Sequence, residues 1–478
     1  MTAQHDADRP VVVIGAGPVG LAAAAHLVSR GLPVRVYEAG TSVAAHLEQV
    51  RHMRLFSPWR YDMDTAAREL LQATDWPVPD EEAMPTAGEL VDLYLRPLSE
   101  HPDLSPFIHF NARVVAISRH GIDKAKTAGR DKADFLVRVS TAGGLIEQRA
   151  RAVIDASGTW SQPNPVGAHG LPAVGEPQAR AQLSYGMPDI LGTERARFAG
   201  RRVLVVGAGH SAAGNLLALA ELAEADSRTH IVWAVRGHDL RRLFGGGSRD
   251  GLPARGELGT RLQALVREGR LELRTGFAIR AIERVGDTLT VHAIDSQRAS
   301  IAGVHEIVTA TGSRPDLALA RELRARFDPW LESTEALAPL IDPNEHSCGT
   351  VRPHGHRELA HPQEPGFYAI GAKSYGRAPN FLLATGYEQA RSVVAALAGD
   401  WVAADDVQLV LPETGVCSVD LAGQAPEVGA ACCGGPPTTD ASACCAADES
   451  AKTQGQAGCG CGPRASAPSK PRTVACCG

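Results

Sequence analysis

The chain contains a glycine-rich turn twice, and each copy stands between a predicted strand and a predicted helix. The first copy is Val-Val-Val-Ile-Gly15-Ala-Gly17-Pro-Val-Gly20, followed by an alanine-rich stretch. The second has glycines at Gly207 and Gly209, with Ala212 in the third position. A G-x-G-x-x-G/A turn in this setting is the fingerprint of a dinucleotide-binding βαβ unit. The sequence therefore predicts two nucleotide-binding domains in one polypeptide.

Apolar segments after each turn indicate how the two domains are connected. Each turn is followed much later by an apolar strand that ends in Ala-Ser/Thr-Gly, at residues 152–158 and 307–312. Because the second unit repeats the plan of the first, one domain is predicted to be inserted in the other. A strand at 366–371 and a helix at 385–397 would return the chain to the outer domain. Further strands are predicted at 34–38, 113–118, 135–140, 230–236, 271–274 and 288–294.

The predicted fold class is α/β, with two Rossmann-like domains of three ββα layers. The proline- and glycine-rich residues 161–198 show no clear element. After Leu421 the chain has no further Leu, Ile, Met or aromatic residue, so the tail is predicted to be disordered. The predicted boundaries are 1–165 and 326–415 for the outer domain, 166–325 for the inserted domain and 416–478 for the tail.

Composition limits the partners that we expect. The net charge of −6 gives no reason to expect nucleic acid or an anionic membrane surface as a partner. The polar N-terminus does not resemble a signal peptide. Residues 11–28 form a long uncharged run, but its glycines and proline fit a strand, turn and helix better than a membrane span. We therefore expect a cytoplasmic protein. The sequence leaves its oligomeric state open, and a homodimer is one alternative.

The ends of the second strands distinguish the two nucleotide sites. The pyrophosphate of a dinucleotide sits at a helix N-terminus. Glu38 ends the strand after the first turn, where a carboxylate accepts ribose hydroxyls and repels a 2′-phosphate, so this site fits FAD or NAD. Arg236 takes the corresponding place after the second turn, where a cation suits the 2′-phosphate of NADPH. A solvated surface arginine is the alternative for Arg236.

The order of these motifs resembles the two-dinucleotide-binding flavoproteins over residues 10–400. Within them, Ala156-Ser-Gly-Thr-Trp160 and Gly207-Ala-Gly-His-Ser211 look most like the flavin-containing monooxygenase branch. The resemblance implies hydride transfer from NADPH to flavin N5, oxygen addition at C4a and oxygen delivery to a soft nucleophile. It assigns Gly15, Gly17, Gly20, Glu38, Ala156, Gly158 and Gly371 to FAD, and Gly207, Gly209, Ser211, Ala212 and Arg236 to NADPH.

The sequence departs from that family at two places. The Phe-x-Gly hallmark followed by histidine is missing, and His169-Gly-Leu-Pro stands in its region. Gly371 is followed by Ala372 and Lys373, where related flavoproteins usually place an aspartate. Lys373 is therefore a catalytic candidate that would face the flavin and stabilise an anionic reduced ring; an exposed lysine is the alternative.

Cysteine usage argues against a disulfide reductase with a redox pair beside the flavin. No cysteine precedes Cys348, which is either a second catalytic candidate or a small buried apolar residue. The cationic residues that follow it form either a substrate entrance or a polar loop. These residues are Arg352, His354, His356, Arg357 and His361.

Eight of the ten cysteines lie in the last part of the chain, in four close pairs. Adjacent thiols, or thiols one residue apart, suit soft thiophilic ions such as trivalent arsenic or antimony, mercury and copper(I). A redox-sensitive or zinc-scavenging tail is the alternative. The predicted metal ligands are Cys432, Cys433, Cys444, Cys445, Cys459, Cys461, Cys476 and Cys477.

Tail and body together resemble the flavin monooxygenase-like proteins of bacterial arsenic-resistance operons. The main functional hypothesis is an NADPH-dependent FAD monooxygenase that uses oxygen on a small-molecule or metalloid substrate, in particular trivalent arsenic, which the tail collects. A flavin-dependent reductase of metals or disulfides, similar to mercuric or thioredoxin reductase, is the second hypothesis. A metal-sequestering flavoprotein is the third.

Overall fold

The structure is a computed structural model that describes residues 9–238, 244, 253–297, 300–345, 352–378 and 382–409. The described residues belong to one compact unit. Cys348 and the predicted metal ligands of the tail lie outside them, as does the predicted disorder of the tail.

Five parallel strands form the first sheet, in the order β16-β7-β1-β2-β3. Its central strand β1 is buried along its whole length. Alternate side chains point to opposite faces, so that Val11 and Val13 pack under helices while Val12 and Ile14 pack under a second sheet. The strands are β1 (Val11–Ile14), β2 (Val34–Tyr37), β3 (Ile108–His109), β7 (Ala152–Asp155) and β16 (Phe367–Ala369).

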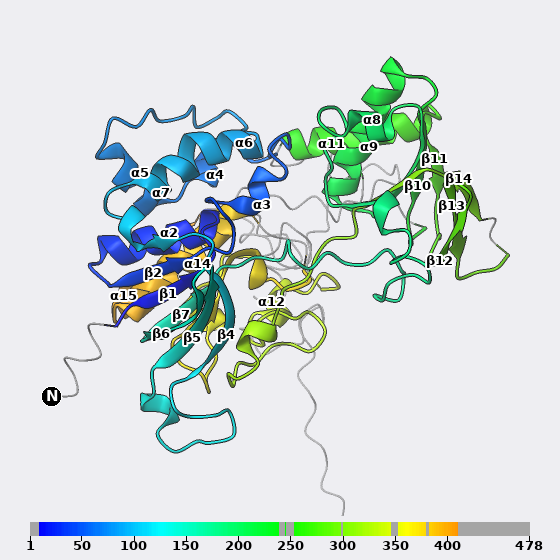
Figure 1. The fold of residues 1–478 in the computed structure, drawn as a ribbon. Helices are drawn as coiled ribbons and strands as arrows, with labels where there is room; N and C mark the ends of the chain where they lie inside the picture. Colours follow the sequence, from blue (N-terminus) through cyan, green and yellow to red (C-terminus); the bar gives the residue numbers. More distant parts are fainter. Residues whose placement is uncertain are drawn as a thin grey trace, which may run out of the picture. The chain divides into compact units, whose positions relative to one another are not determined.

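Helices cover one face of this sheet and an antiparallel sheet covers the other (Figure 1). The helices are α2 (Pro18–Ser29) and α14 (Leu383–Leu397), with α5 (Thr65–Gln72) packed on α2. Residues 22–25 of α2 are all alanine and fully buried, so α14 packs directly against this helix. The antiparallel strands are β4 (Arg113–Arg119), β5 (Phe135–Thr141) and β6 (Gly144–Ala150).

A second parallel sheet repeats these three layers, in the order β11-β10-β9-β15-β8. Val203 and Val205 of β9 pack under helices, whereas Leu204 and Val206 pack under the antiparallel strands. The parallel strands are β8 (Leu183–Tyr185), β9 (Arg202–Val206), β10 (His230–Ala234), β11 (Glu272–Arg274) and β15 (Glu306–Thr309). The other layers are helices α9 (His210–Ala225) and α11 (Pro253–Arg267), and strands β12 (Ile279–Val285), β13 (Thr288–Ala293) and β14 (Ile301–Val304).

Short helical segments make up the remaining described elements. The α-helical ones are α3 (Ala45–Glu48), α4 (Trp59–Asp62), α6 (Ala87–Leu90), α7 (Arg96–Glu100), α8 (Arg195–Phe198), α12 (Ala338–Ile341), α13 (His356–Leu359) and α15 (Trp401–Asp405). The tighter or wider turns are η1 (Val91–Leu95), η2 (Ser105–Phe107), η3 (Arg130–Lys132), η4 (Arg180–Gln182), η6 (Ala318–Ala320) and η7 (Gly371–Lys373).

The strand order confirms that one nucleotide-binding fold is inserted in the other. Strand β7 pairs with β1 and β15 pairs with β9 in the same parallel manner. Strand β16 then pairs with β7, so the chain returns to the first sheet. The two connecting segments run side by side, because Asn164 donates to Gly312 and Arg314 donates to Gln162 through backbone N–H groups, each over 2.9 Å. The residue numbers of the predicted boundaries stay a prediction.

Two details of the sequence prediction are wrong. Residues 161–198 contain η4, strand β8 and helix α8, although they show no periodic pattern. Strand β8 has three residues and exists because β15 pairs with it along the edge of the second sheet. The antiparallel strands β6, β12 and β14 were also missed. β6 is mostly exposed, so its pairing with β5, rather than an alternation of buried and exposed side chains, determines its conformation.

No helix in the part of the chain that the structure describes is both long and apolar enough to cross a membrane. The run at residues 11–28 is divided between β1, the glycine-rich turn and α2, as its glycines and proline predict.

Candidate functional site

The glycines of the first turn serve two purposes: two of them avoid collisions within the protein, and the third leaves space for a ligand. Gly15 has φ of +98°, and a Cβ at this position would lie 2.9 Å from the Ala156 carbonyl oxygen. A Cβ on Gly20 would collide with the Gly15 carbonyl oxygen. A Cβ on Gly17, in contrast, would meet no atom within 4 Å. The backbone at Gly17 is therefore open, as the approach of a pyrophosphate requires.

Helix α2 begins directly after Gly17 and presents the positive end of its dipole to this opening. The helix carries Pro18 in its first turn and has no acidic residue there. Proline is favourable at this position because its missing N–H would have no partner inside the helix. The turn and helix thus form an anion site that fits the pyrophosphate of a dinucleotide.

The backbone holds the carboxylate of Glu38 in the wall beside this turn. Ala16 donates its N–H to Glu38 Oε2 over 2.8 Å, and Gly40 donates to Oε1 over 2.6 Å. These bonds fix the orientation of the carboxylate and leave each oxygen a further lone pair. Glu38 can therefore accept hydrogen bonds from the hydroxyls of an adenosine ribose, as the sequence predicts.

The second glycine-rich turn has the same geometry. Gly207 has φ of +137°, and a Cβ there would collide with the Ala310 carbonyl oxygen. A Cβ on Gly209 would again meet nothing within 4 Å. Ala212 is fully buried at the start of α9, and that helix has no acidic residue in its first turn. The second turn therefore also fits a pyrophosphate.

A cavity of about 1260 Å³ has Gly15 and Gly17 of the first turn in its wall, together with the first residues of helix α9, which follow the second turn. Volumes of roughly 300–1,000 Å³ are typical of small-molecule and cofactor sites, so this cavity is large. The predicted FAD residues in its wall are Gly15, Gly17, Glu38, Ala156, Gly158 and Gly371, and the predicted NADPH residue is Ser211. Gly20, Gly207, Gly209, Ala212 and Arg236 do not line it.

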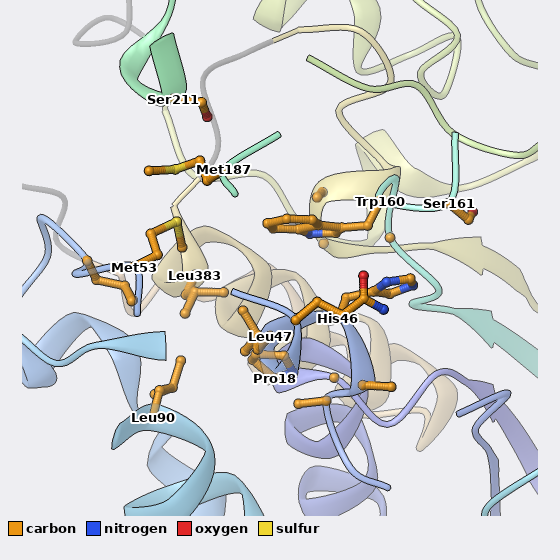
Figure 2. A pocket seen from close by; sticks show the side chains of 18 of the residues that line it. Pro18, His46, Leu47, Met53, Leu90, Trp160, Ser161, Met187, Ser211 and Leu383 are labelled. Atoms are coloured by element: carbon orange, nitrogen blue, oxygen red, sulfur yellow. The ribbon is translucent and has the colours of Figure 1, made fainter. Parts of the chain in front are cut away.

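Aromatic rings and thioethers form much of the remaining wall. Figure 2 shows Trp160 and His46 on one side of the cavity and Met53 and Met187 on the other. The rings of Trp160 and His46 are nearly parallel, with centroids 6.4 Å apart and an angle of 13° between the planes. A planar heteroaromatic ring can stack on either face, and the polarisable sulfurs can contact it at its edge.

Lys373 is neither exposed nor in the wall of the cavity. Its ammonium lies 2.6 Å from Asp155 Oδ2, and both side chains are almost completely buried. The same Nζ donates to Ser157 Oγ over 2.8 Å, and that hydroxyl donates to Asp155 Oδ1 over 2.6 Å. The alternative of an exposed lysine is therefore wrong. Ser157 lines the cavity, so the charge of Lys373 is compensated by Asp155 and separated from the cavity by Ser157.

Arg236 lies just beyond the end of β10, with an exposed guanidinium that donates to the Ala168 carbonyl oxygen over 3.5 Å. This position agrees with either interpretation of Arg236. Cys348 lies outside the described ranges. Within those ranges, no three His, Cys, Asp or Glu side chains are grouped so that they could hold a metal ion.

The cationic residues after Cys348 do not form a substrate entrance in the cavity described above. His354, His356 and His361 are buried, and none of the five cationic residues lines the cavity. His356 contacts the Ser392 hydroxyl, and Arg357 pairs with Asp405. Burial lowers the pKa of His361 to about 4, so this ring is neutral at pH 7. The structure therefore gives the three histidines a packing role, whereas Arg352 and Arg357 are exposed.

Sequence reasoning missed several residues of the wall. His46, Met53 and Met187 follow no motif. His46 reaches the cavity from helix α3, Met53 from the segment after it and Met187 from the segment after β8. Trp160 was available from the sequence, because it belongs to the quoted Ala-Ser-Gly-Thr-Trp motif. Asp155 was visible only as a strand end, and its pairing with Lys373 depends on strands β7 and β16 being neighbours.

Known proteins match this chain over most of its described length. Residues 12–350 match the family described as pyridine nucleotide-disulphide oxidoreductase. Ferredoxin–NADP reductase of Rhodospirillum rubrum is 24% identical over 381 residues, which are 80% of this chain and 88% of that protein. Flavin-containing monooxygenase FMO GS-OX-like 9 of Arabidopsis thaliana is 27% identical over 257 residues, which are 48% of this chain and 51% of the plant protein.

A solved structure shares the fold. It is DfoA bound to FAD, the desferrioxamine biosynthetic pathway cadaverine monooxygenase from Erwinia amylovora, with a TM-score of 0.59 and 14% identity. The match covers 85% of this chain and 98% of that one. The family match extends over well more than half of the chain and includes both glycine-rich turns. The chain is an NAD(P)H-dependent flavin oxidoreductase that binds FAD and NADP(H), and it belongs to the pyridine nucleotide-disulphide oxidoreductase family.

Proposed function

We propose that the chain is an NADPH-dependent FAD monooxygenase that transfers oxygen to a soft, thiophilic substrate, with trivalent arsenic as the first candidate. The observation that carries this proposal is that one cavity is lined by Gly15 and Gly17 of the first turn and by His210 and Ser211, which directly follow Gly209 of the second turn. Hydride transfer requires the nicotinamide and the flavin to be held in contact. When bound, FAD supplies the hydride acceptor and the group that activates oxygen.

The two turns hold different nucleotides in this proposal. Glu38 marks the first turn for FAD and Arg236 marks the second for NADPH. The FAD residues are Gly15, Gly17, Gly20, Glu38, Ala156, Gly158 and Gly371. The NADPH residues are Gly207, Gly209, Ser211, Ala212 and Arg236.

Two features support a soft oxygen acceptor. The four thiol pairs after residue 431 suit thiophilic ions, and thiols tethered to the enzyme raise the local concentration of such an ion. The chain has no cysteine before Cys348, so its sequence offers no thiol pair of the kind that reduces disulfides beside a flavin. The balanced reaction converts NADPH, a proton, oxygen and an As(III) species into NADP⁺, water and the As(V) species that carries the added oxygen.

The direct experiment incubates the purified holoenzyme with NADPH, oxygen and arsenite or methylarsenite. We expect substrate-stimulated consumption of NADPH and oxygen in equal amounts, together with a pentavalent arsenic product found by speciation. Catalase in a parallel sample separates oxygen transfer from peroxide release. Unchanged NADPH consumption with both arsenite and methylarsenite would contradict the proposal.

Removing residues 422–478 tests the role of the tail. We expect KM for the metalloid to rise about tenfold and kcat to stay the same, because the tail changes local concentration rather than the chemical step. The kinetics of the truncated and full-length chains with the same substrate measure this split. An unchanged KM would show that the tail does not deliver substrate. Loss of metalloid tolerance in cells with no change in either kinetic constant would favour sequestration.

Replacing Arg236 by alanine tests the cofactor assignment of the second turn. We expect KM for NADPH to rise about tenfold while KM for NADH stays the same, because a charge-assisted bond to the 2′-phosphate is worth about 1.5 kcal/mol. Arg228→Ala is the matched control, since Arg228 lies just before the same strand β10, is exposed and pairs with Asp226. An equal rise in KM for NADPH and for NADH in Arg236→Ala would show that Arg236 does not select between the two coenzymes.

A reductase is the second candidate. The family is described as an oxidoreductase of disulphides, and Ferredoxin–NADP reductase is among the relatives. In that case the tail thiols would carry electrons, and replacing Cys476 and Cys477 by serine would abolish turnover. In the monooxygenase proposal the same change only raises KM.

A further inference from the structure

A buried carboxyl group lies directly behind the wall of the cavity. Asp62 ends helix α4 and has no exposed surface. Ser57 donates its hydroxyl to Asp62 Oδ1 over 2.8 Å, and Ser57 is one of the residues that line the cavity. The serine hydroxyl is therefore the group that connects this carboxyl to the space in which the cofactors would bind.

The second carboxyl oxygen of Asp62 has no hydrogen-bond partner among the residues that the structure describes. A buried carboxylate in such a place is costly unless it binds a proton. Burial raises the pKa of Asp62 to about 7, against the smaller opposing effect of the Ser57 hydroxyl. The group is thus able to exchange a proton near neutral pH.

The titratable groups around Asp62 come from four packed elements. Tyr387 of α14 donates its hydroxyl to the main-chain oxygen of Asp62 over 2.8 Å. Tyr94 of η1 accepts the N–H of Asp64, which precedes α5, over 2.9 Å. Burial raises the pKa of both tyrosines, so both stay neutral. His26 of α2 lies 3.0 Å from Asp64 Oδ2, so its imidazole is engaged with the other acid.

Asp64 shows that burial alone does not make a proton-exchange site. Its Oδ1 accepts the N–H of Ala67 over 3.0 Å and its Oδ2 contacts His26, so both oxygens have partners. Asp64 caps helix α5 in this way and does not line the cavity. Of these two neighbouring acids, Asp62 is the one with a carboxyl oxygen that has no hydrogen-bond partner among the described residues. It is also the one that accepts a hydrogen bond from Ser57 in the wall of the cavity.

We propose that Asp62 is a proton-exchange site of the cavity, connected to it by the Ser57 hydroxyl. In the uptake step, Ser57 Oγ passes its proton to Asp62 and takes one from a water or other acid in the cavity. One O–H bond forms on the carboxyl group and one breaks on the cavity donor, so a single proton moves and no electrons do. The site would supply or accept the proton that balances hydride transfer. This role rests on the proposed function, because it requires the cavity to hold the flavin.

The test is an infrared pH titration of the holoenzyme, with difference spectra that report the protonated carboxyl band. We expect a band that titrates with a midpoint near pH 7 and is lost in Asp62→Asn. Ser57→Ala should shift the midpoint upward, because the hydrogen bond that lowers the pKa is removed, and should slow proton uptake on dithionite reduction at least tenfold. Asp342→Asn, which changes another buried acid outside the cavity wall, should leave band and rate unchanged.

The results separate this proposal from the proposed function. A band that persists in Asp62→Asn, a midpoint below pH 5, or a Ser57→Ala protein with unchanged midpoint and uptake rate would each overturn the inference. None of these readouts depends on a metalloid substrate, so failure of the arsenic assay leaves the titration intact. Should Asp62→Asn not retain flavin, Ser57→Ala and the wild-type chain still decide the outcome through midpoint and uptake rate.

Discussion

Replacing Gly17 by valine is expected to give a folded protein that is purified without flavin. The backbone at Gly17 has φ of −80°, which any residue adopts, and a Cβ there meets no protein atom within 4 Å. The added side chain therefore fills only the space that the pyrophosphate needs. We expect affinity for FAD to fall at least about 100-fold, equivalent to about 3 kcal/mol. Flavin absorbance per chain and titration of the apoprotein with FAD measure the loss.

Gly209→Val is the matched change in the second turn. Gly209 has φ of −111° and the same open surroundings. This protein should keep its flavin and lose binding of NADPH by a similar factor. Loss of flavin from Gly209→Val, or its retention in Gly17→Val, would contradict the assignment of FAD to the first turn.

Replacing Lys373 by methionine is expected to lower the free energy of unfolding by about 3–5 kcal/mol. The change leaves Asp155 buried without its cation, and an uncompensated buried charge is strongly destabilising. Unfolding in urea, followed by tryptophan fluorescence, measures the effect. Adding Asp155→Asn should recover most of the loss, because the pair is then neutral.

The control for this prediction is an exposed ion pair. Arg138 and Glu147 lie on neighbouring strands with side chains 47% and 48% exposed. Glu147→Gln should cost less than about 1 kcal/mol, as surface pairs usually do. If Lys373→Met were no less stable than Glu147→Gln, the buried pair of Lys373 and Asp155 would not stabilise the fold.

Much of the fold could be predicted because it depends on local signals. Both glycine-rich turns, their flanking strands and helices, and the return of the chain through β16 follow from short apolar runs and glycine positions. Strands β6 and β8 lack such signals. β6 is largely exposed, and β8 is a three-residue edge strand. Each exists because its backbone pairs with that of a neighbouring strand.

The site could be predicted only where its residues belong to a sequence motif. Gly15, Gly17 and Glu38 stand at fixed positions in a motif, so the sequence identified them. Lys373 was recognised as unusual, but its partner was not, because Asp155 is more than two hundred positions away in the sequence. Ser57 and Asp62 are close in sequence and match no motif, and only burial distinguishes their contact from an ordinary surface pair.

The measurement that tests the central claim most directly is anaerobic reduction of the bound flavin by NADPH. The account predicts that one equivalent of NADPH bleaches the flavin absorbance of the wild-type holoenzyme within the turnover time, and that Gly209→Val, with the same flavin content, bleaches far more slowly. A holoenzyme whose flavin stays oxidised with NADPH under argon, yet is bleached by dithionite, would contradict hydride transfer between two nucleotides in this cavity.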